Sequence, residues 1–402
     1  MPYSLLEAKS IEQLCKVIDC EHKTAPYIEQ SEYHVVRTSN VRNGQLHMKD
    51  MKYTTVDGFK EWTARAVPEY GDVLFTREAP AGESCLVPSD RKICMGQRMV
   101  MLRANQLEVD PLFLSMVLNT ERTKADILRL SIGSTVSRIN IADIKKLKVA
   151  SPPINEQRKI AKTLSTWDKA ICTTERLINN SKEQKKALMQ QLLTGKKRLL
   201  DDSGKPFDGN WEEVKLSEVA QITMGSSPKS SAYNDTKDGL PLLQGNADIK
   251  NRKSVPRTYT SEITKQCYVG DILFSVRAPV GTVAISYHNA CIGRGIAAIK
   301  AKANHSQEFL YQWLLSFELK WDRYSQGSTF EAVNSNDIKS LHITIPNKTE
   351  QQKIASVLTN ADKEIEILEQ QLADLKQEKK ALMQQLLTGK RRVKTNKEEE
   401  VA

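Results

Sequence analysis

Three short segments carry residue types that could support catalysis, but each lacks a residue that its chemistry requires. Ser151-Pro152-Pro153-Ile154 approaches the Asn/Asp-Pro-Pro-aromatic motif of adenine methyltransferases, without the amide for the exocyclic amine or the aromatic ring for a flipped base. Asp90-Arg91-Lys92 has the Asp-x-Lys spacing of a nuclease, but a carboxylate-bound metal needs several converging acidic groups. Thr194-Gly195-Lys196 is no phosphate-binding loop, because Gln190 stands where the first glycine must be. A rigid lead-in to a helix and polar turns explain these segments better than catalysis does.

The chain is a tandem duplication. Residues 185–196 read Lys-Lys-Ala-Leu-Met-Gln-Gln-Leu-Leu-Thr-Gly-Lys, and the same letters return at residues 379–390, an offset of 194. The match extends without a gap back to Ser131 and Ser325, with half of the aligned positions identical. A period near 200 residues is far too long for a solenoid repeat, so we expect two copies of a globular unit followed by a helix.

The helix of each copy has apolar residues at alternating steps of four and three, which is the spacing of a coiled-coil seam. At 1.5 Å per residue, a helix over residues 155–193 would be roughly 58 Å long. An amphipathic helix on a domain core is the alternative, but the length and the similarity of the two copies favour packing of helix against helix. The seam positions are Ile160, Leu164, Trp167, Ile171, Thr174, Ile178, Ser181, Lys185, Leu188 and Leu192 in the first helix, and Ile354, Leu358, Ala361, Ile365, Leu368, Leu372, Leu375, Lys379, Leu382 and Leu386 in the second.

Both helices carry start and stop signals. Asn155 is a candidate N-cap for the first helix, and Thr349 with Gln352 has the spacing of a capping box for the second. Gly195 and Gly389 follow the last periodic residues, where a glycine is the preferred helix terminator.

A globular unit precedes each helix, and its pattern predicts a mixed α/β fold. Short apolar runs follow glycines at equivalent places in the two units, and a helix begins near Asp110 or Gln307. The strands expected in both units lie at residues 70–77 and 269–277, 99–103 and 296–300, and 144–149 and 338–345.

Composition restricts the class of protein. The 402 residues carry a net charge of +10 with a pI near 9.1, which weakly favours a polyanionic partner. The seven cysteines are scattered without metal-ligand spacing, so we expect reduced thiols and neither a disulfide framework nor a metal site. No apolar run approaches the ~20 residues of a membrane span and the start lacks a signal-peptide pattern, so we expect a cytoplasmic protein.

These patterns predict six segments. Residues 199–210 are rich in turn formers and form the clearest linker, whereas the polar end of the chain is expected to be a flexible tail. The predicted segments are a first globular unit at 1–154, a long helix at 155–198, the linker at 199–210, a second globular unit at 211–348, a second long helix at 349–392 and the tail at 393–402.

This order of elements, with Gly-Asp-Ile-Leu-Phe, Gly-Ser-Thr, a Glu-Gln-x-x-Ile-Ala helix start and Gln-Gln-Leu-Leu-Thr-Gly, resembles the specificity (S) subunit of type I restriction-modification enzymes. The resemblance covers essentially the whole chain. It implies two target recognition domains that each read one half of a gapped DNA site, and two antiparallel helices that dock modification (M) subunits. The M subunits would carry S-adenosylmethionine and methylate adenine, so this chain would need no cofactor, and a separate motor-nuclease subunit would cut.

If the resemblance holds, the DNA contacts come from basic and amide residues in loops, which can meet both phosphates and base edges. A solvated surface charge explains each of these residues equally well. The hydroxyls of the two Gly-Ser-Thr loops could bind phosphate, or those loops could be no more than tight turns. The candidates are Arg37, Ser39, Asn40, Arg42, Arg77, Ser134, Thr135 and Arg138 in the first unit, and Gln244, Asn246, Lys250, Arg252, Arg277, Ser328 and Thr329 in the second.

The sequence therefore predicts a non-catalytic DNA-recognition and scaffold subunit. Its partners would be double-stranded DNA, two M subunits and, through the complex, restriction subunits. Two alternatives stay open: a self-contained DNA-modifying enzyme, which bound S-adenosylmethionine or metal would reveal, and a coiled-coil adaptor that does not bind DNA.

Overall fold

The computed structural model describes residues 6–21, 26–132, 137–325 and 333–394. The candidate residues Ser134, Thr135, Ser328 and Thr329 lie outside this part of the chain. The chain divides into two compact units: unit 1 comprises Met1–Thr174 and Gln371–Ala402, and unit 2 comprises Glu175–Gln370. Within the described ranges, no helix is both long and apolar enough to cross a membrane.

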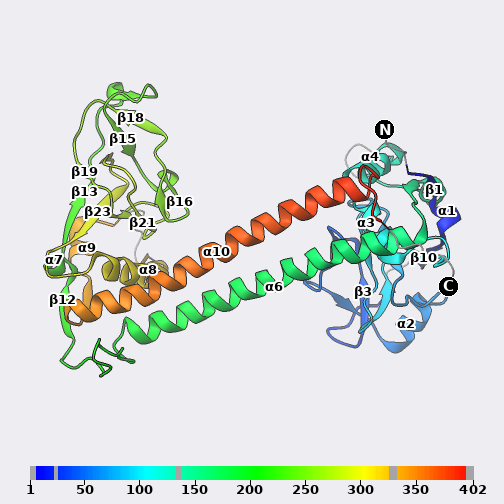
Figure 1. Cartoon of the computed structure of the whole chain (residues 1–402), viewed down its shortest axis with the longest axis horizontal. Coiled ribbons are helices and arrows are strands. Elements are labelled where there is room, and N and C mark those ends of the chain that lie inside the picture. The colour runs from blue at the N-terminus through cyan, green and yellow to red at the C-terminus, as the bar shows by residue number, and fades with distance from the viewer. Residues whose placement is uncertain (1–5, 22–25, 133–136, 326–332, 395–402) are drawn as a thin grey trace. The chain divides into compact units, whose positions relative to one another are not determined.

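Unit 1 is a mixed α/β unit (Figure 1). A four-stranded antiparallel sheet has the order β2-β10-β7-β8, and a three-stranded sheet has the order β6-β3-β9, with β3 and β9 parallel. The two further strand pairs are β1 with β11 and the hairpin β4–β5. The strands are β1 (Ala8–Ser10), β2 (Cys15–Asp19), β3 (Tyr33–Val36), β4 (Val41–Arg42), β5 (Gln45–Leu46), β6 (Lys52–Tyr53), β7 (Val73–Thr76), β8 (Ser84–Leu86), β9 (Lys92–Met95), β10 (Met99–Ala104) and β11 (Lys148–Ala150). The shorter helices are α1 (Ile11–Leu14), the 3-10 helix η1 (Thr38–Asn40), α2 (Val56–Trp62), α3 (Pro111–Leu118), α4 (Glu121–Leu130) and α5 (Ile141–Lys146).

Unit 2 has the same plan with larger sheets (Figure 1). Six strands run in the order β13-β23-β20-β21-β17-β16, five in the order β14-β18-β15-β22-β19, and β12 pairs with β24. The strands are β12 (Glu212–Lys215), β13 (Ala220–Met224), β14 (Tyr233–Asn234), β15 (Leu240–Leu243), β16 (Ile249–Lys250), β17 (Lys253–Ser254), β18 (Thr258–Thr260), β19 (Gln266–Cys267), β20 (Ile272–Ser275), β21 (Val283–Ile285), β22 (Ala290–Ile292), β23 (Ile296–Ala301) and β24 (His342–Ile345). The shorter helices are α7 (Leu216–Val219), the 3-10 helices η2 (Ser230–Ala232) and η3 (Asn246–Asp248), α8 (Gln307–Ser325) and α9 (Ser335–Lys339). The predicted mixed α/β fold is confirmed.

The Gly-Asp pair before β7 and before β20 makes the same turn in both units. Gly71 and Gly270 have φ angles of +91° and +90°, a region that glycine adopts most readily. The buried carboxylates of Asp72 and Asp271 each accept a hydrogen bond, at 2.8 Å, from the backbone N–H three positions earlier. This turn directs the next strand into the core, which explains why the motif occurs twice.

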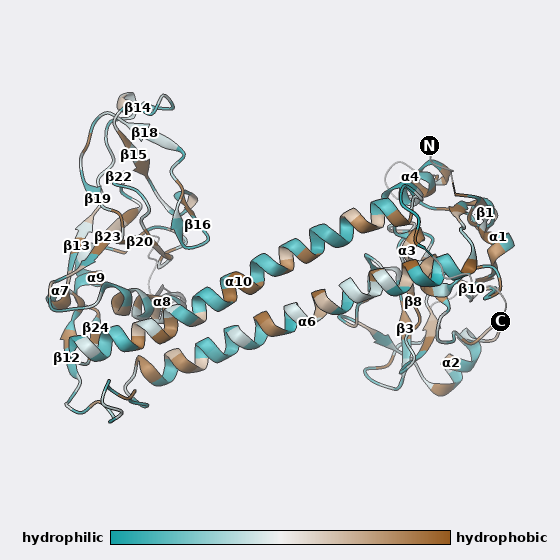
Figure 2. Cartoon of the chain, viewed as in Figure 1, coloured by the Kyte–Doolittle hydropathy of each residue, from teal (hydrophilic) through white to brown (hydrophobic). Residues whose placement is uncertain are grey.

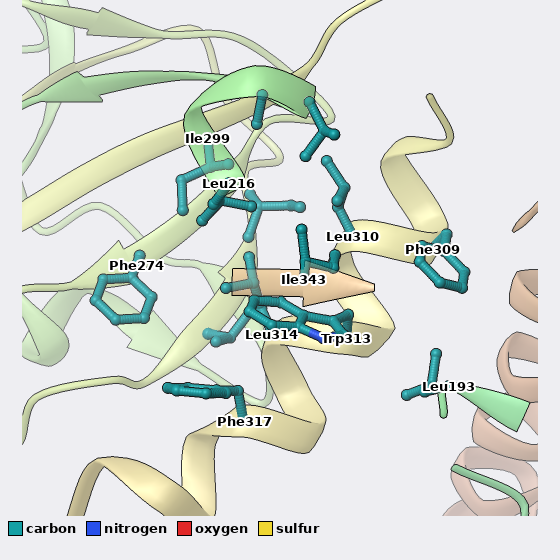
Figure 3. Close-up of a cluster of buried hydrophobic side chains, with 14 of the residues drawn as sticks. Leu193, Leu216, Phe274, Ile299, Phe309, Leu310, Trp313, Leu314, Phe317 and Ile343 are labelled. Atoms are coloured by element: carbon teal, nitrogen blue, oxygen red, sulfur yellow. The ribbon is translucent and has the colours of Figure 1, made fainter. Parts of the chain in front are cut away.

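The core of unit 2 lies between the sheet containing β20 and β23 and helix α8. Figure 3 shows Phe274 and Ile299 from those strands together with Leu310 and Leu314 from α8, and all four are fully buried. In unit 1, Phe75 and Phe113 occupy the corresponding places and are also fully buried. Deleting such a side chain typically costs about 3–5 kcal/mol.

The last predicted strand of each unit is wrong in its first half. Ile144 and Ile338 lie in the short helices α5 and α9, and only the residues after those helices form β11 and β24. Both isoleucines are fully buried, so their apolar character reports burial rather than a strand. Asn334 caps α9 by accepting hydrogen bonds from the backbone N–H groups of Asn336 and Asp337 at 2.8 and 3.1 Å.

The two long helices are α6 (Ile154–Leu192) and α10 (Lys348–Leu386), of 39 residues each. In unit 1 the first part of α6 lies beside the last part of α10, and in unit 2 the last part of α6 lies beside the first part of α10 (Figure 1). The helices are therefore antiparallel, and the predicted packing of helix against helix is confirmed. Figure 2 shows hydrophilic residues along much of both helices, interrupted by hydrophobic ones.

All twenty seam positions are buried or half-buried, whereas most positions between them are exposed. Burial is deepest where a helix also meets its globular unit, at Ile160, Leu164, Ile354 and Leu358, each fully buried. Burial of a leucine or isoleucine side chain contributes about 1.5–3 kcal/mol relative to exposure. The positions buried to at least nine-tenths are Ile160, Leu164, Thr174, Ile178, Leu192, Ile354, Leu358, Ile365 and Leu386, and the half-buried ones are Trp167, Ile171, Ser181, Lys185, Leu188, Ala361, Leu368, Leu372, Leu375, Lys379 and Leu382.

Both predicted helix starts need correction. The cap of α10 is Asn347, whose Oδ1 accepts the backbone N–H of Glu350 at 2.9 Å, so Thr349 lies inside the first turn. Helix α6 already begins at Ile154, which places Asn155 inside it. The predicted glycine stop signals hold, because Gly195 and Gly389 follow the helices with φ of +69° and +74°. The helices end at Leu192 and Leu386, before the predicted bounds of 198 and 392.

Candidate nucleic-acid interface

Three loops of unit 2 are joined by backbone hydrogen bonds into one structure, which we call the loop junction of unit 2 (residues 244–246, 276–277 and 293–295). The N–H of Gly293 donates to the carbonyl of Leu243 at 2.8 Å, and the N–H of Gly295 donates to that of Gln244 at 3.1 Å. The N–H of Val276 then donates to the carbonyl of Gly295 at 3.0 Å. The ends of β15, β20 and β22 thereby present their next side chains together.

At two positions in or beside this junction, neighbouring backbone segments lie so close together that only glycine fits. A Cβ at Gly295 would lie 2.2 Å from the carbonyl oxygen of Gln244. A Cβ at Gly225, in the loop after β13, would lie 2.1 Å from the carbonyl oxygen of Gly293. Such close backbone packing makes the loops a firm platform for the side chains that project from them.

Unit 1 contains the equivalent loop junction (residues 37–39, 77–78 and 96–98). The N–H of Gly96 donates to the carbonyl of Val36 at 2.8 Å, and the N–H of Arg77 donates to that of Arg98 at 2.8 Å. The N–H of Ile139 donates in turn to the carbonyl of Arg77 at 3.0 Å, as Val333 does to Val276 at 2.9 Å in unit 2. The two units therefore repeat one backbone arrangement with different side chains.

Several predicted DNA contacts project from these junctions. In unit 2, Gln244 and Arg277 are exposed and Asn246 is half-buried, while in unit 1 Ser39 and Arg138 are exposed. The backbone of Arg138 bridges that of Glu78 at the junction of unit 1. The described residues provide no side-chain hydrogen bond or ion pair for Arg277, so its guanidinium is available to a ligand.

Arg42 and Lys250 occupy equivalent places in two short hairpins beside the junctions. Each stands just before a two-residue turn with positive φ, formed by Asn43 with Gly44 and by Asn251 with Arg252. Lys250 is exposed. Arg42 is half-buried and donates to two carbonyl oxygens of its own loop at 2.6 and 2.7 Å. Arg37 is likewise half-buried and donates to the carbonyl of Asp50 at 2.7 Å.

Asn40 and Arg77, which the sequence predicts as DNA contacts, are buried and bound within unit 1. Asn40 is 1% exposed, accepts the N–H of Arg37 at 3.1 Å and donates to two loop carbonyls at 3.2 Å. Arg77 is 7% exposed, and its Nη1 lies 3.2 Å from Oδ1 of Asp19. Its equivalent in unit 2 is the buried Val276, so the position points inward in both units.

Arg252 is already bound within unit 2. Its two terminal nitrogens lie 2.6 and 2.7 Å from the two carboxylate oxygens of Glu318 on α8. The carboxylate raises the pKa of Arg252 by hydrogen bonding, against the opposing effect of burial. This bidentate pair holds the hairpin β16–β17 against α8, so Arg252 supports the interface rather than projecting from it.

Two exposed arginines in the junctions, Arg98 and Arg294, are not among the residues predicted from the sequence. Each comes within two residues after a glycine that precedes a strand, Gly96 before β10 and Gly293 before β23. The glycine–strand pattern predicts a strand start at both places, and the basic residue between the glycine and the strand is the signal that the sequence offers.

The helix pair repeats its polar contacts as well. Lys185 on α6 pairs with Asp362 on α10 at 2.5 Å, and their equivalents, Lys379 and Asp168, pair at 2.5 Å with the helices exchanged. Reciprocal pairs at both ends fix the register in which the antiparallel helices meet.

The Glu-Gln helix start also has a structural explanation. Glu156 and Glu350 lie in the first turns of α6 and α10, where they bind Arg392 and Arg198, which follow the end of the opposite helix. The amide of the adjacent glutamine, Gln157 in α6, binds backbone groups of residues 108, 110 and 152 at 2.7–3.0 Å. The motif therefore anchors each long helix to its globular unit and to the end of the other helix.

The residues that the structure describes contain no group of three or more His, Cys, Asp or Glu side chains placed to hold a metal ion. The seven cysteines are free thiols and six of them are buried. Burial raises the pKa of Cys15, Cys85 and Cys94 to about 12, which keeps these thiols protonated and unreactive at neutral pH.

Comparison with known proteins agrees with this architecture. The family model for the type I restriction modification DNA specificity domain matches the chain twice, at residues 4–183 and 208–377. The chain belongs to this family. Specificity subunits are the non-catalytic DNA-recognition subunits of type I restriction-modification systems, so the prediction of such a subunit is confirmed.

Individual relatives match this specificity subunit over nearly its whole length. The chain is 33% identical over 376 residues to a Methanocaldococcus jannaschii protein named as the MjaX type I restriction enzyme specificity subunit, and the match covers 90% of this chain and 88% of the relative. A structure from a study of complex assembly and conformational transition of the type I R-M system is 25% identical, with a TM-score of 0.62 and coverage of 96% and 100%. The S subunit of M. genitalium shares the fold, with a TM-score of 0.64, 16% identity and coverage of 96% and 97%.

Proposed function

We propose that this specificity subunit reads a bipartite, interrupted site on double-stranded DNA, with one unit on each half. The observation that carries this proposal is the repeated loop junction, because the same backbone hydrogen bonds present a different set of exposed side chains in each unit. Two unlike readers give an asymmetric site. If each unit occupies one major-groove face, the two half-sites recur about one helical turn apart.

We further propose that α6 and α10 dock adenine-methylating M subunits, two for each specificity subunit, and that a restriction subunit joins through the complex. S-adenosylmethionine would bind the M subunits and not this chain. Most residues of the long helices outside the seam are exposed and could meet partners. The complex would act in the cytoplasm, where the DNA is.

The proposal is tested by mapping methylated adenines in the host genome with and without this gene. A bipartite motif that loses methylation with the gene supports the proposal. Exchanging residues 211–345 for the equivalent part of another specificity subunit should then change one half of the motif and leave the other unchanged. A change in both halves would contradict independent reading.

A second measurement separates this function from catalysis by the chain itself. The purified chain is incubated with labelled S-adenosylmethionine and DNA, alone and with its M partner. We expect methyl transfer only when the M partner is present. Binding or transfer by the isolated chain would show that it is an enzyme in its own right.

A further inference from the structure

At its loop junction, each unit exposes an arginine whose Nε is held by protein atoms. In unit 2, the backbone N–H and the Nε of Arg294 both donate to Oγ of Ser227, at 3.1 and 3.3 Å. In unit 1, the Nε of Arg98 forms an ion pair with Oε2 of Glu78 at 3.0 Å. Among the residues that the structure describes, the terminal nitrogens of both guanidinium groups have no partner.

The loop junctions fix where these arginines stand. The carbonyl of Arg98 accepts the N–H of Arg77 at 2.8 Å, and Gly295, directly after Arg294, accepts the N–H of Val276 at 3.0 Å. Arg98 keeps 55% of its side chain exposed and Arg294 is also exposed. Each arginine therefore projects into solvent from a backbone that is bonded on two sides.

The backbone of Arg98 indicates that its position matters. Its φ of +69° lies in the left-handed region, which residues with a side chain seldom adopt. Such a conformation is strained for a residue with a side chain and tends to occur at functional sites. The ion pair with Glu78 holds the strained residue with its guanidinium outward.

We propose that Arg98 and Arg294 each read one guanine in the half-site of their own unit, which deepens the proposed function and rests on it. A guanidinium fixed at Nε presents its two terminal nitrogens as a planar fork, and that fork matches O6 and N7 of guanine in the major groove. Ser227 and Glu78 are positioning residues that orient the forks.

Charge argues for a base edge rather than a phosphate at Arg98. The carboxylate of Glu78 beside the guanidinium repels a phosphate, whereas the neutral acceptors of guanine suffer little from it. The hydrogen bond from Val276 to Gly295 brings Arg277 close to Arg294. Arg277 has no side-chain partner among the described residues and can meet the DNA backbone, which leaves the oriented fork of Arg294 for the base.

The test uses the full-length chain assembled with its M partner and DNA duplexes randomised at each position of the methylated site. Arg294→Lys keeps the charge but loses the fork. We expect discrimination to fall by roughly 5- to 150-fold at a single G·C pair, within the half-site of unit 2. Arg98→Lys should do the same within the other half-site, so each variant serves as the control for the other.

Ser227→Ala distinguishes positioning from general stability. It should weaken discrimination at the same base pair as Arg294→Lys, and it should add nothing when combined with that variant. Arg129→Lys, on the exposed surface of α4, is the matched control and should leave the recognised motif unchanged. Thermal melting of each variant shows whether the fold is retained.

The proposal is overturned if either lysine variant keeps the motif, or if affinity falls equally for every sequence while the salt slope drops by about one unit, which marks a phosphate contact. If Arg294→Lys folds poorly, the base-pair discrimination of Ser227→Ala is the deciding measurement. An unchanged motif in Ser227→Ala would refute the orienting contact. A wild-type complex without any bipartite motif would refute the proposed function itself, which is a different result.

Discussion

The ion pair between Arg198 and Glu350 offers a quantitative test of how the long helices are anchored. The Nε and Nη2 of Arg198 donate to the two carboxylate oxygens of Glu350 at 2.7 Å each. The side chain of Glu350 has no exposed surface, whereas Arg198 keeps 25% of its side chain exposed. Replacing Arg198 by alanine therefore leaves a carboxylate buried without its partner.

The expected cost follows from this geometry. Removing one partner of a buried ion pair typically costs about 3–5 kcal/mol. Two features place the expected loss at the lower end of this range, near 3 kcal/mol. Arg198 is partly exposed, and Glu350 lies in the first turn of α10, where the helix dipole contributes up to about 1 kcal/mol. For a domain of 150–250 residues, each kcal/mol lowers the melting temperature by roughly 2–4 °C, so we expect a fall of about 6–12 °C.

The assay is calorimetric unfolding of the full-length chain, with hydrogen exchange of peptides from unit 2 to identify its transition. Lys353→Ala is the control, because Lys353 pairs with Asp202 at 2.6 Å but Asp202 is 95% exposed. An exposed pair contributes about 0–1 kcal/mol. If Arg198→Ala destabilised unit 2 no more than Lys353→Ala does, the buried pair would not anchor the helix, and the reasoning would fail.

Three further predictions concern association, pH and salt. A fragment of residues 203–402 should dimerise more tightly than one of residues 1–202, because Leu368 and Leu375 of its seam replace Thr174 and Ser181 of the first seam, each adding very roughly 1.5 kcal/mol of burial; sedimentation over one concentration range tests this, and tighter association of the N-terminal fragment would contradict it. Burial, reinforced by two nearby lysines, lowers the pKa of His305, so the neutral form is favoured in the folded state. Its contribution is complete above its ordinary pKa of 6.5 and is lost as the pH falls, and His305→Gln should flatten the dependence of unfolding free energy on pH below 6.5; an unchanged profile would refute it. Arg277→Ala should weaken DNA binding about equally for all sequences and reduce the salt slope by about one unit, as expected for a phosphate contact, whereas a selective loss at one base pair would show base reading.

The sequence was sufficient for the features that repeat. Identical letters at residues 185–196 and 379–390 predict the duplication, and seam periodicity predicts that α6 and α10 pack together. The strands β7 and β20 follow from glycine, aspartate and a short apolar run, which are local signals. Local signals also explain the errors at α5 and α9, because a buried isoleucine in a short helix looks like one in a strand.

The interface could not be predicted from the sequence in full, because it depends on contacts between residues far apart in the chain. Arg77 looks like an exposed loop arginine until its partner Asp19, which is 58 residues away, is seen beside it. The loop junction of unit 1 brings together Val36, Gly96 and Arg77 through backbone hydrogen bonds that leave no mark in composition. Arg98 was visible in the sequence, but its exposure and its tether to Glu78 were not.

The way in which unit 1 is completed has a consequence for biosynthesis. Its core includes Leu386 and Leu387, which are 4% and 2% exposed, and the half-buried Val393 packs against it. Unit 2, in contrast, ends at Gln370, so all of its residues precede the last segment of unit 1. As the chain leaves the ribosome, the first unit to be synthesised is thus the last able to finish folding. Termination directly after unit 2 would leave unit 1 with an open apolar surface, so the core of unit 1 can form only after the segment up to Val393 has been synthesised.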